Sequence, residues 1–90
     1  MYSISEDQYR EVMERLVEEV HRKDYYSGSI SGVFHDDVEW HLELAVVVYN
    51  DGWAINDIVP VWWNFNTYND EDELNNDFQF EEIRTLIKEY

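Results

Sequence analysis

The sequence contains no cysteine, and this absence excludes several kinds of stabilisation and chemistry. Disulfide bonds, thiolate metal ligands and cysteine nucleophiles all require that residue. A small domain without disulfides is typical of a reducing compartment, so we expect a cytoplasmic protein. The first residues contain neither a basic region nor an apolar core, and we therefore expect no signal peptide.

Long hydrophobic runs and glycine-rich motifs are also missing. The longest uninterrupted apolar run covers residues 44–49, far below the roughly 20 residues that a membrane-spanning helix needs. No phosphate-binding loop, dinucleotide fingerprint or serine nucleophile motif occurs. We therefore expect no membrane association, no catalytic residues and no cofactor. The protein is not expected to be an enzyme.

Positive charge is scarce and unevenly distributed. The chain has 6 Lys and Arg against 21 Asp and Glu, a net charge of −15. Residues 24–83 contain no Lys or Arg, whereas an ordinary stretch of that length has about seven. We expect the six cations to lie in two helices, one near each end of the chain, with Arg22 and Lys23 in the last turn of the first. They are Arg10, Arg15, Arg22, Lys23, Arg84 and Lys88.

This charge pattern limits the choice of partner. Nucleic acids and anionic membranes repel such a protein, so direct binding to either is not expected. A basic protein surface is the favoured partner. In the extreme case the carboxylates would mimic DNA phosphates and occupy the nucleic-acid-binding surface of another protein. The alternative is that the acidity serves solubility alone.

The remaining composition favours a folded chain. Hydrophobic residues make up 44% and aromatic residues 17%, unlike a disordered acidic tail. Ninety residues fit one domain, so we treat residues 1–90 as a single unit.

A helix is predicted at the N-terminus and another at the C-terminus. Ser5 and Gln8 fit a capping box at the start of the first helix. Its apolar stripe has helical spacing and consists of Val12, Met13, Leu16, Val17 and Val20. The final helix is predicted over residues 79–89, with Asn76 or Asp77 as its cap.

Three strands are predicted between the helices, over residues 25–34, 38–49 and 53–68. Asn50-Asp51-Gly52 is a hairpin turn signal. The third strand loses its phase near Asn56-Asp57 and contains Pro60, so we expect a bulge there and Pro60 at an edge. Residues 69–73 are predicted to be a solvated acidic loop.

The element order α-β-β-β-α predicts an α+β domain with a three-stranded antiparallel meander. The two helices are expected to pack on one face of the sheet and to leave the opposite face uncovered.

That uncovered face is the predicted partner-binding site. Glu39, His41 and Glu43 alternate with apolar residues and share one side of the second strand, followed by Tyr49. Adjacent Trp62 and Trp63 must point to opposite faces of a regular strand. One of them should be part of the core, and the other should be an exposed interface anchor.

Two alternatives for this face stay open. The first is a homodimer in which Ala45, Val47 and Tyr49 of two copies meet. The second is a metal site formed by Glu39, His41 and Glu43, since imidazole and carboxylate oxygens bind divalent ions. A solvated strand face explains the same three residues without any metal, and we assign no metal ligand.

Residues 57–65 contain the distinctive string Pro60-Val61-Trp62-Trp63. Together with residues 44–49 and Asn76-Asp77-Phe78, this stretch resembles small acidic proteins carried on mobile elements of Bacteroides-like bacteria. The resemblance covers about half of the chain. It implies a mobile-element context and assigns no site residues.

Overall fold

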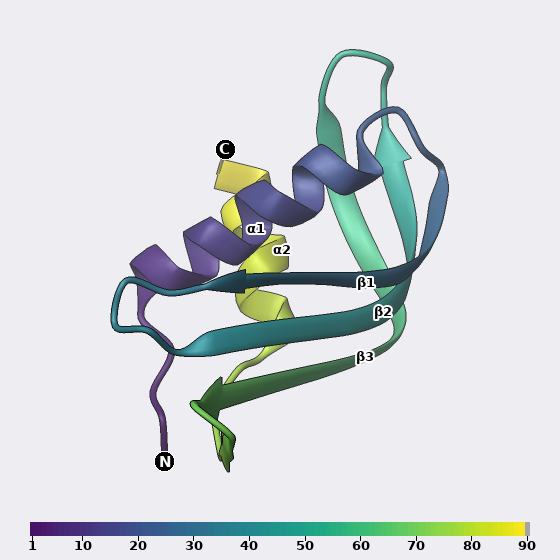
Figure 1. The fold of residues 1–90 in the computed structure, drawn as a ribbon. Helices are drawn as coiled ribbons and strands as arrows, with labels where there is room; N and C mark the ends of the chain where they lie inside the picture. The colour runs from purple at the N-terminus through teal and green to yellow at the C-terminus, as the bar shows by residue number, and fades with distance from the viewer. Residues whose placement is uncertain (90) are drawn as a thin grey trace.

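The computed structural model describes residues 1–89 as a curved antiparallel sheet with two helices (Figure 1). The elements in chain order are α1 (Glu6–Val20), β1 (Tyr25–Val33), β2 (Glu39–Asn50), β3 (Ile55–Asn69), β4 (Asp72–Leu74) and α2 (Phe80–Glu89). The α+β class is confirmed. Among the described residues, no helix is both long enough and apolar enough to cross a membrane.

The sheet has four strands in the order β1-β2-β3-β4, not the predicted three. β4 pairs with the end of β3, where Thr67 lies opposite Leu74 and Asn69 opposite Asp72. A tight turn at Asp70, with φ of 56°, folds the chain back onto β3. The predicted acidic loop over residues 69–73 is therefore wrong for its last part. Three residues are too few for alternation to be recognised, and their acidic side chains resemble those of a loop.

Helix α1 begins as predicted but ends at Val20, so the placement of Arg22 and Lys23 in its last turn is wrong. The backbone N–H of Gln8 donates to Ser5 Oγ at 3.2 Å, and the backbone N–H of Ser5 donates to Gln8 Oε1 at 2.8 Å. This reciprocal pair satisfies two donors that the first turn otherwise leaves free. The apolar stripe of α1 is buried at Val12, Met13, Leu16 and Val20, while Val17 is half-buried.

Helix α2 begins at Phe80, so the cap predicted at Asn76 or Asp77 is wrong. Asn76 Oδ1 instead accepts the backbone N–H of Phe78 at 3.0 Å. Asp77 Oδ1 accepts the backbone N–H of Ile4 at 2.8 Å, which ties the N-terminal segment to the residues before α2. Both side chains hold the approach to the helix and do not cap it.

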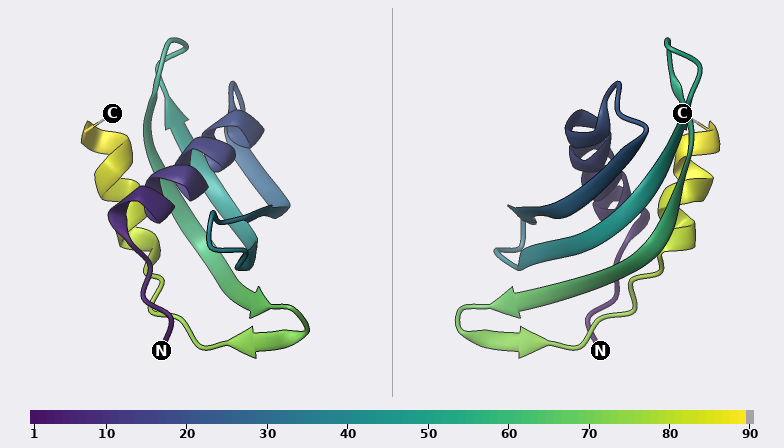
Figure 2. Two further views of the ribbon diagram at one scale, coloured as in Figure 1. Left: turned by 60° about the vertical axis from the view of Figure 1, so that its left-hand side comes forward. Right: turned by 90° about the vertical axis from the view of Figure 1, so that its right-hand side faces the viewer.

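The core lies between the helices and one face of the sheet (Figure 2). β2 contributes its alternate residues to this inner face: Trp40, Leu42, Leu44, Val46 and Val48 are all buried. The right-hand view of Figure 2 looks onto the other face, and no helix lies in front of the strands there.

The predicted irregularity of β3 is confirmed at two places. The β2–β3 register shifts between Ala45 and Val46, which leaves Val61 unpaired, and between Tyr49 and Asn50, which leaves Asn56 unpaired. Pro60 lies beside the first shift, in the part of β3 that has β2 on one side and no strand on the other. Proline lacks a backbone donor, so this edge position is where a strand tolerates it.

Candidate functional site

The outer face of the sheet carries five of the six residues predicted to bind a partner. Because side chains alternate along a strand, burial of Trp40 and Leu42 on the inner face directs Glu39, His41 and Glu43 outward. Tyr49 follows on the same face. The register brings Trp62 of β3 opposite Ala45, which places its side chain on the outer face as well.

Trp63 does not belong to this group. It lies opposite Leu44 on the inner side of the sheet and is half-buried. Its ring centroid is 5.4 Å from that of Phe78 and 6.5 Å from that of Phe80. The prediction that the two tryptophans face opposite ways is confirmed, and Trp63 lies apart from the other five residues of the predicted partner-binding site. Trp63 packs where the chain enters α2.

One half of the outer face is anionic. Glu39 and Glu43 are exposed on β2, and the β3–β4 turn brings Asp70 and Glu71 to the same region. These residues help line an open cleft of about 290 Å³. The other residues of its lining are His41, Asn66 and Tyr68.

His41 is held between a carboxylate and an aromatic ring within that cleft. Its Nε2 lies 3.5 Å from Glu39 Oε1, and its ring stands edge-on to Tyr68 with centroids 5.4 Å apart. The sequence predicts that His41 and Glu39 share one side of a strand, and the structure confirms this. Asp70, Glu71 and Tyr68 join them only through the pairing of β3 with β2 and β4, although the acidic run at residues 70–73 was visible in the sequence.

The other half of the outer face is apolar and aromatic. Trp62 is 49% exposed and Tyr49 is 54% exposed, which is high for such large side chains. Val47 and Val59 lie opposite each other between them and are half-buried. Ala45, which lies opposite Trp62 in the register, is only 3% exposed.

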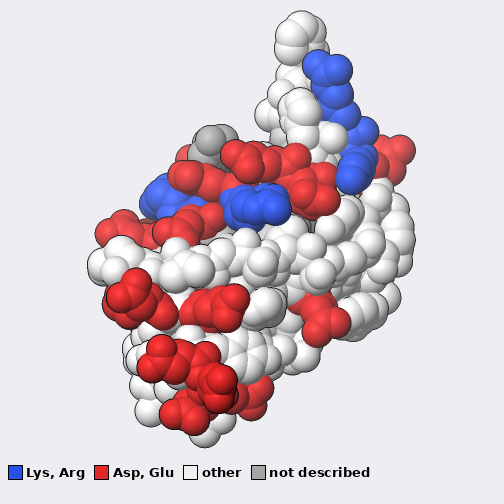
Figure 3. All heavy atoms as spheres, in the orientation of Figure 1, with Lys and Arg blue, Asp and Glu red and all other residues white. Residues whose placement is uncertain are grey.

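The cations of the molecule lie away from the anionic half. In Figure 3 the visible Lys and Arg side chains lie over α1 and toward the β2–β3 turn, while the lower part, where the strands lie, shows carboxylates and no cation. Arg84 on α2 is engaged by Asp57 at 2.8 Å and by Glu81 at 2.7 Å. The outer face therefore presents carboxylates with few of the protein's own cations nearby.

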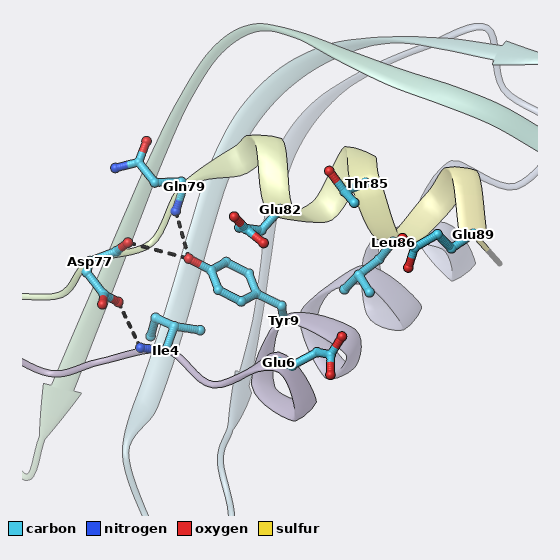
Figure 4. A pocket seen from close by; sticks show the side chains of 9 residues that line it. All are labelled: Ile4, Glu6, Tyr9, Asp77, Gln79, Glu82, Thr85, Leu86 and Glu89. Carbon is cyan, nitrogen blue, oxygen red and sulfur yellow. Dashed lines mark hydrogen bonds between the residues drawn. The ribbon is translucent and has the colours of Figure 1, made fainter.

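A second, larger cleft of about 450 Å³ separates the segment before α1 from α2 (Figure 4). The Tyr9 hydroxyl accepts the backbone N–H of Gln79 at 3.0 Å and donates to the carbonyl of Asp77 at 3.4 Å. Burial raises the pKa of Tyr9, so this hydroxyl stays protonated well above neutral pH. The polar atoms of this cleft are thus already hydrogen-bonded within the protein. These hydrogen bonds join the start of α1 to the residues that precede α2.

The metal alternative receives no support from the geometry. Within residues 1–89, no three side chains of His, Asp or Glu converge in a way that could hold a metal ion. Glu39 and His41 are in contact, but the other carboxylates of the anionic half spread along the strands.

Comparison with known proteins adds no assignment. No protein-family model, curated protein or solved structure matches this chain.

Proposed function

We propose that this protein is a non-catalytic interaction module that binds a basic protein surface through the outer face of its sheet. The observation that carries the proposal is the composition of that face. Carboxylates occupy one half of it, exposed aromatic residues occupy the other, and both helices pack on the opposite side.

The anionic half supplies long-range attraction. Carboxylates that are not neutralised by neighbouring cations accelerate the encounter with a positively charged partner more than they increase the final affinity. The association rate should therefore fall steeply as salt is added, because exposed charges are screened within about 10 Å at ordinary ionic strength.

The aromatic half supplies the anchor. Trp62 and Tyr49 retain about half of their surface in the free protein, and tryptophan and tyrosine dominate the binding energy of many interfaces. Burial of the indole of Trp62 in a pocket of the partner would give the short-range part of the affinity. Trp63 contributes indirectly, because it packs beneath the strand that carries Trp62.

An accessory or inhibitory role follows from this mode of binding. A protein that covers the basic surface of a nucleic-acid-binding protein prevents that surface from contacting phosphates. Full mimicry of DNA is the extreme form. Cytoplasmic location and a mobile-element context, which rest on the sequence alone, complete the proposal.

A homo-oligomer is the second candidate, and the exposed apolar half of the same face favours it. Tyr49, Val47 and Trp62 of two copies could cover each other, with Ala45 already buried behind them. The net charge of −15 opposes this association at low salt. Light scattering at high protein concentration and high salt distinguishes the two candidates, since a monomer under those conditions excludes the oligomer.

Site-specific photo-crosslinking in cells of the source organism tests the proposal. A photoreactive residue at Tyr49 should cross-link basic proteins, and the yield should fall when Glu39→Gln and Glu43→Gln are combined with Trp62→Ala. Trp53→Ala is the matched control, since Trp53 is 93% exposed but lines a groove with Met13 and Val17 on the helix side. Equal cross-linking by the control and the triple variant would contradict the proposal.

A further inference from the structure

Strand β1 forms one edge of the sheet, and its hydrogen-bonding directions follow from the two ends of its pairing with β2. The N–H of Val48 donates to the carbonyl of Asp24 at 2.8 Å, and the N–H of Phe34 donates to the carbonyl of Val38 at 2.9 Å. Hydrogen-bonded and non-hydrogen-bonded pairs alternate along an antiparallel ladder. The register therefore makes hydrogen-bonded pairs with β2 at four residues of the strand, namely Tyr26, Gly28, Ile30 and Gly32.

The residues between them direct their backbone N–H and C=O groups away from β2, toward the free edge. They are Tyr25, Ser27, Ser29, Ser31 and Val33. The hydroxyl of Tyr26 donates to the carbonyl of Ser29 over 3.5 Å, which occupies one of these acceptors weakly. All five of these edge-facing residues are exposed. The edge is accessible from solvent.

This edge lacks the protection that proteins usually give to such strands. β1 contains no charged residue and no proline, and its pairing with β2 has no register shift. Edges are normally blocked by lysine, proline or bulges, because free backbone groups recruit other strands. The open edge of β3 shows this protection: it has Pro60, two register shifts, and Arg84 of α2 bound to Asp57.

We propose that β1 accepts an extended basic segment of the partner as an additional strand along residues 27–33. The proposal rests on the proposed function and specifies how the partner binds. An added strand would pair with the free backbone groups of β1, as in other cases of β-strand addition, in which main-chain hydrogen bonds supply affinity and alternate side chains supply specificity.

The side chains beside this edge determine the chemistry of the segment. Ser29 lies opposite Glu43, and Val33 opposite Glu39. Strands are about 4.8 Å apart, so the carboxylates of β2 lie about 10 Å from the backbone of an added strand. Lys or Arg at alternate positions could extend over the short serine side chains and reach them. A second copy of this chain fits poorly, since β1 carries no cation and each copy has a net charge of −15.

The probe is a short capped peptide that alternates lysine with valine, labelled with a fluorophore and titrated with the protein at low salt. Ser29→Pro removes an edge-facing N–H and leaves the β1–β2 hydrogen bonds intact, while Ser29→Ala removes only the hydroxyl. We expect Ser29→Pro to weaken binding by about tenfold or more, and Ser29→Ala to change it by less than about twofold. Glu43→Gln should weaken binding and reduce its dependence on salt.

Amide hydrogen exchange locates the bound peptide independently of any variant. In the free protein, the N–H groups of Ser27, Ser29 and Ser31 should exchange rapidly, and those of Gly28 and Ile30 slowly. The peptide should slow exchange at the three serines and leave the other two unchanged. This readout uses the unmodified chain, so it decides the proposal even if Ser29→Pro fails to fold.

The possible failures are distinguishable. Peptide binding that is sensitive to Glu43→Gln, without protection of the three serine amides, would overturn strand addition and leave docking on the face intact. Absence of binding, or binding unaffected by Glu43→Gln and by salt, would overturn both. Protection of the serine amides that rises with protein concentration in the absence of peptide would show that a second copy occupies the edge, which also overturns the proposal.

Discussion

The ion pair between Arg84 on α2 and Asp57 on β3 should contribute about 2 kcal/mol to the free energy of unfolding, and Arg84→Met tests this. Arg84 Nε donates to Asp57 Oδ1 at 3.0 Å and Arg84 Nη2 donates to Asp57 Oδ2 at 2.8 Å, so the contact is bidentate. The side chains are 22% and 20% exposed. Exposed pairs contribute about 0.2–1 kcal/mol and breaking buried pairs costs about 3–5 kcal/mol, so a partly buried pair falls between these values. Methionine preserves much of the packing of the arginine stem.

The pH dependence of this loss has a definite sign. The hydrogen bonds from Arg84 hold the pKa of Asp57 below its ordinary value of 3.8. A carboxyl group whose pKa is lowered by folding stabilises the protein above its ordinary pKa, and this contribution disappears as the pH falls through the folded value. The difference in the free energy of unfolding between wild type and Arg84→Met should therefore have its full size at neutral pH and should shrink below about pH 4.

Urea unfolding followed by tryptophan fluorescence measures the difference at each pH. A loss of about 2 kcal/mol corresponds to a fall of about 8–16 °C in Tm for a domain of this size. Arg10→Met is the matched control, since Arg10 lies 3.9 Å from Glu6 on an exposed part of α1. It should cost at most about 0.5 kcal/mol. If both variants lose the same stability at neutral pH, or if the Arg84 effect persists unchanged at pH 3, the reasoning is refuted.

Two further predictions concern the aromatic residues. Trp63→Ala should cost about 2–3 kcal/mol, because its ring packs against Phe78, whereas Trp62→Ala should cost about 1 kcal/mol; urea unfolding that gives equal losses would contradict their placement on opposite faces. Burial and the hydrogen bond to Asp36 raise the pKa of Tyr2 to about 12. Its folded pKa lies above its unfolded value, so the stabilisation is complete below about pH 10 and is lost as the pH rises toward 12. Tyr2→Phe should remove that part of the decline in unfolding titrations, and an identical decline in both proteins would exclude Tyr2 as its source.

Strands β2 and β3 show which structural features a local sequence pattern can predict. Alternation of apolar and polar residues predicted that Glu39, His41 and Glu43 share one face, and the register confirms it. The loss of phase near Asn56, together with Pro60, predicted the irregular edge strand, since a bulge and a missing donor both act within one strand. These features depend on neighbours in sequence, and a sequence displays them directly.

The rest of the candidate site depended on pairing between distant segments. Asp70 and Glu71 reach the anionic cleft only because β4 folds back onto β3, and the acidic character of residues 69–73 resembled a loop. The strict alternation that separates Trp62 from Trp63 did not say which of the two faces outward. That depended on the position of Phe78 beneath β3, near the start of α2.

The sequence by itself determined the α+β class, the capped first helix, the alternation of β2 and the scarcity of cations between residues 24 and 83. Each of these is a local property that composition or a repeat of two or 3.6 residues records. Only the tertiary structure decided that Asp57 binds Arg84, that a fourth strand completes the sheet, and that β1 lies at an edge of the sheet. Such features arise from contacts between residues far apart in the chain, where register and packing select one partner among many of similar local character.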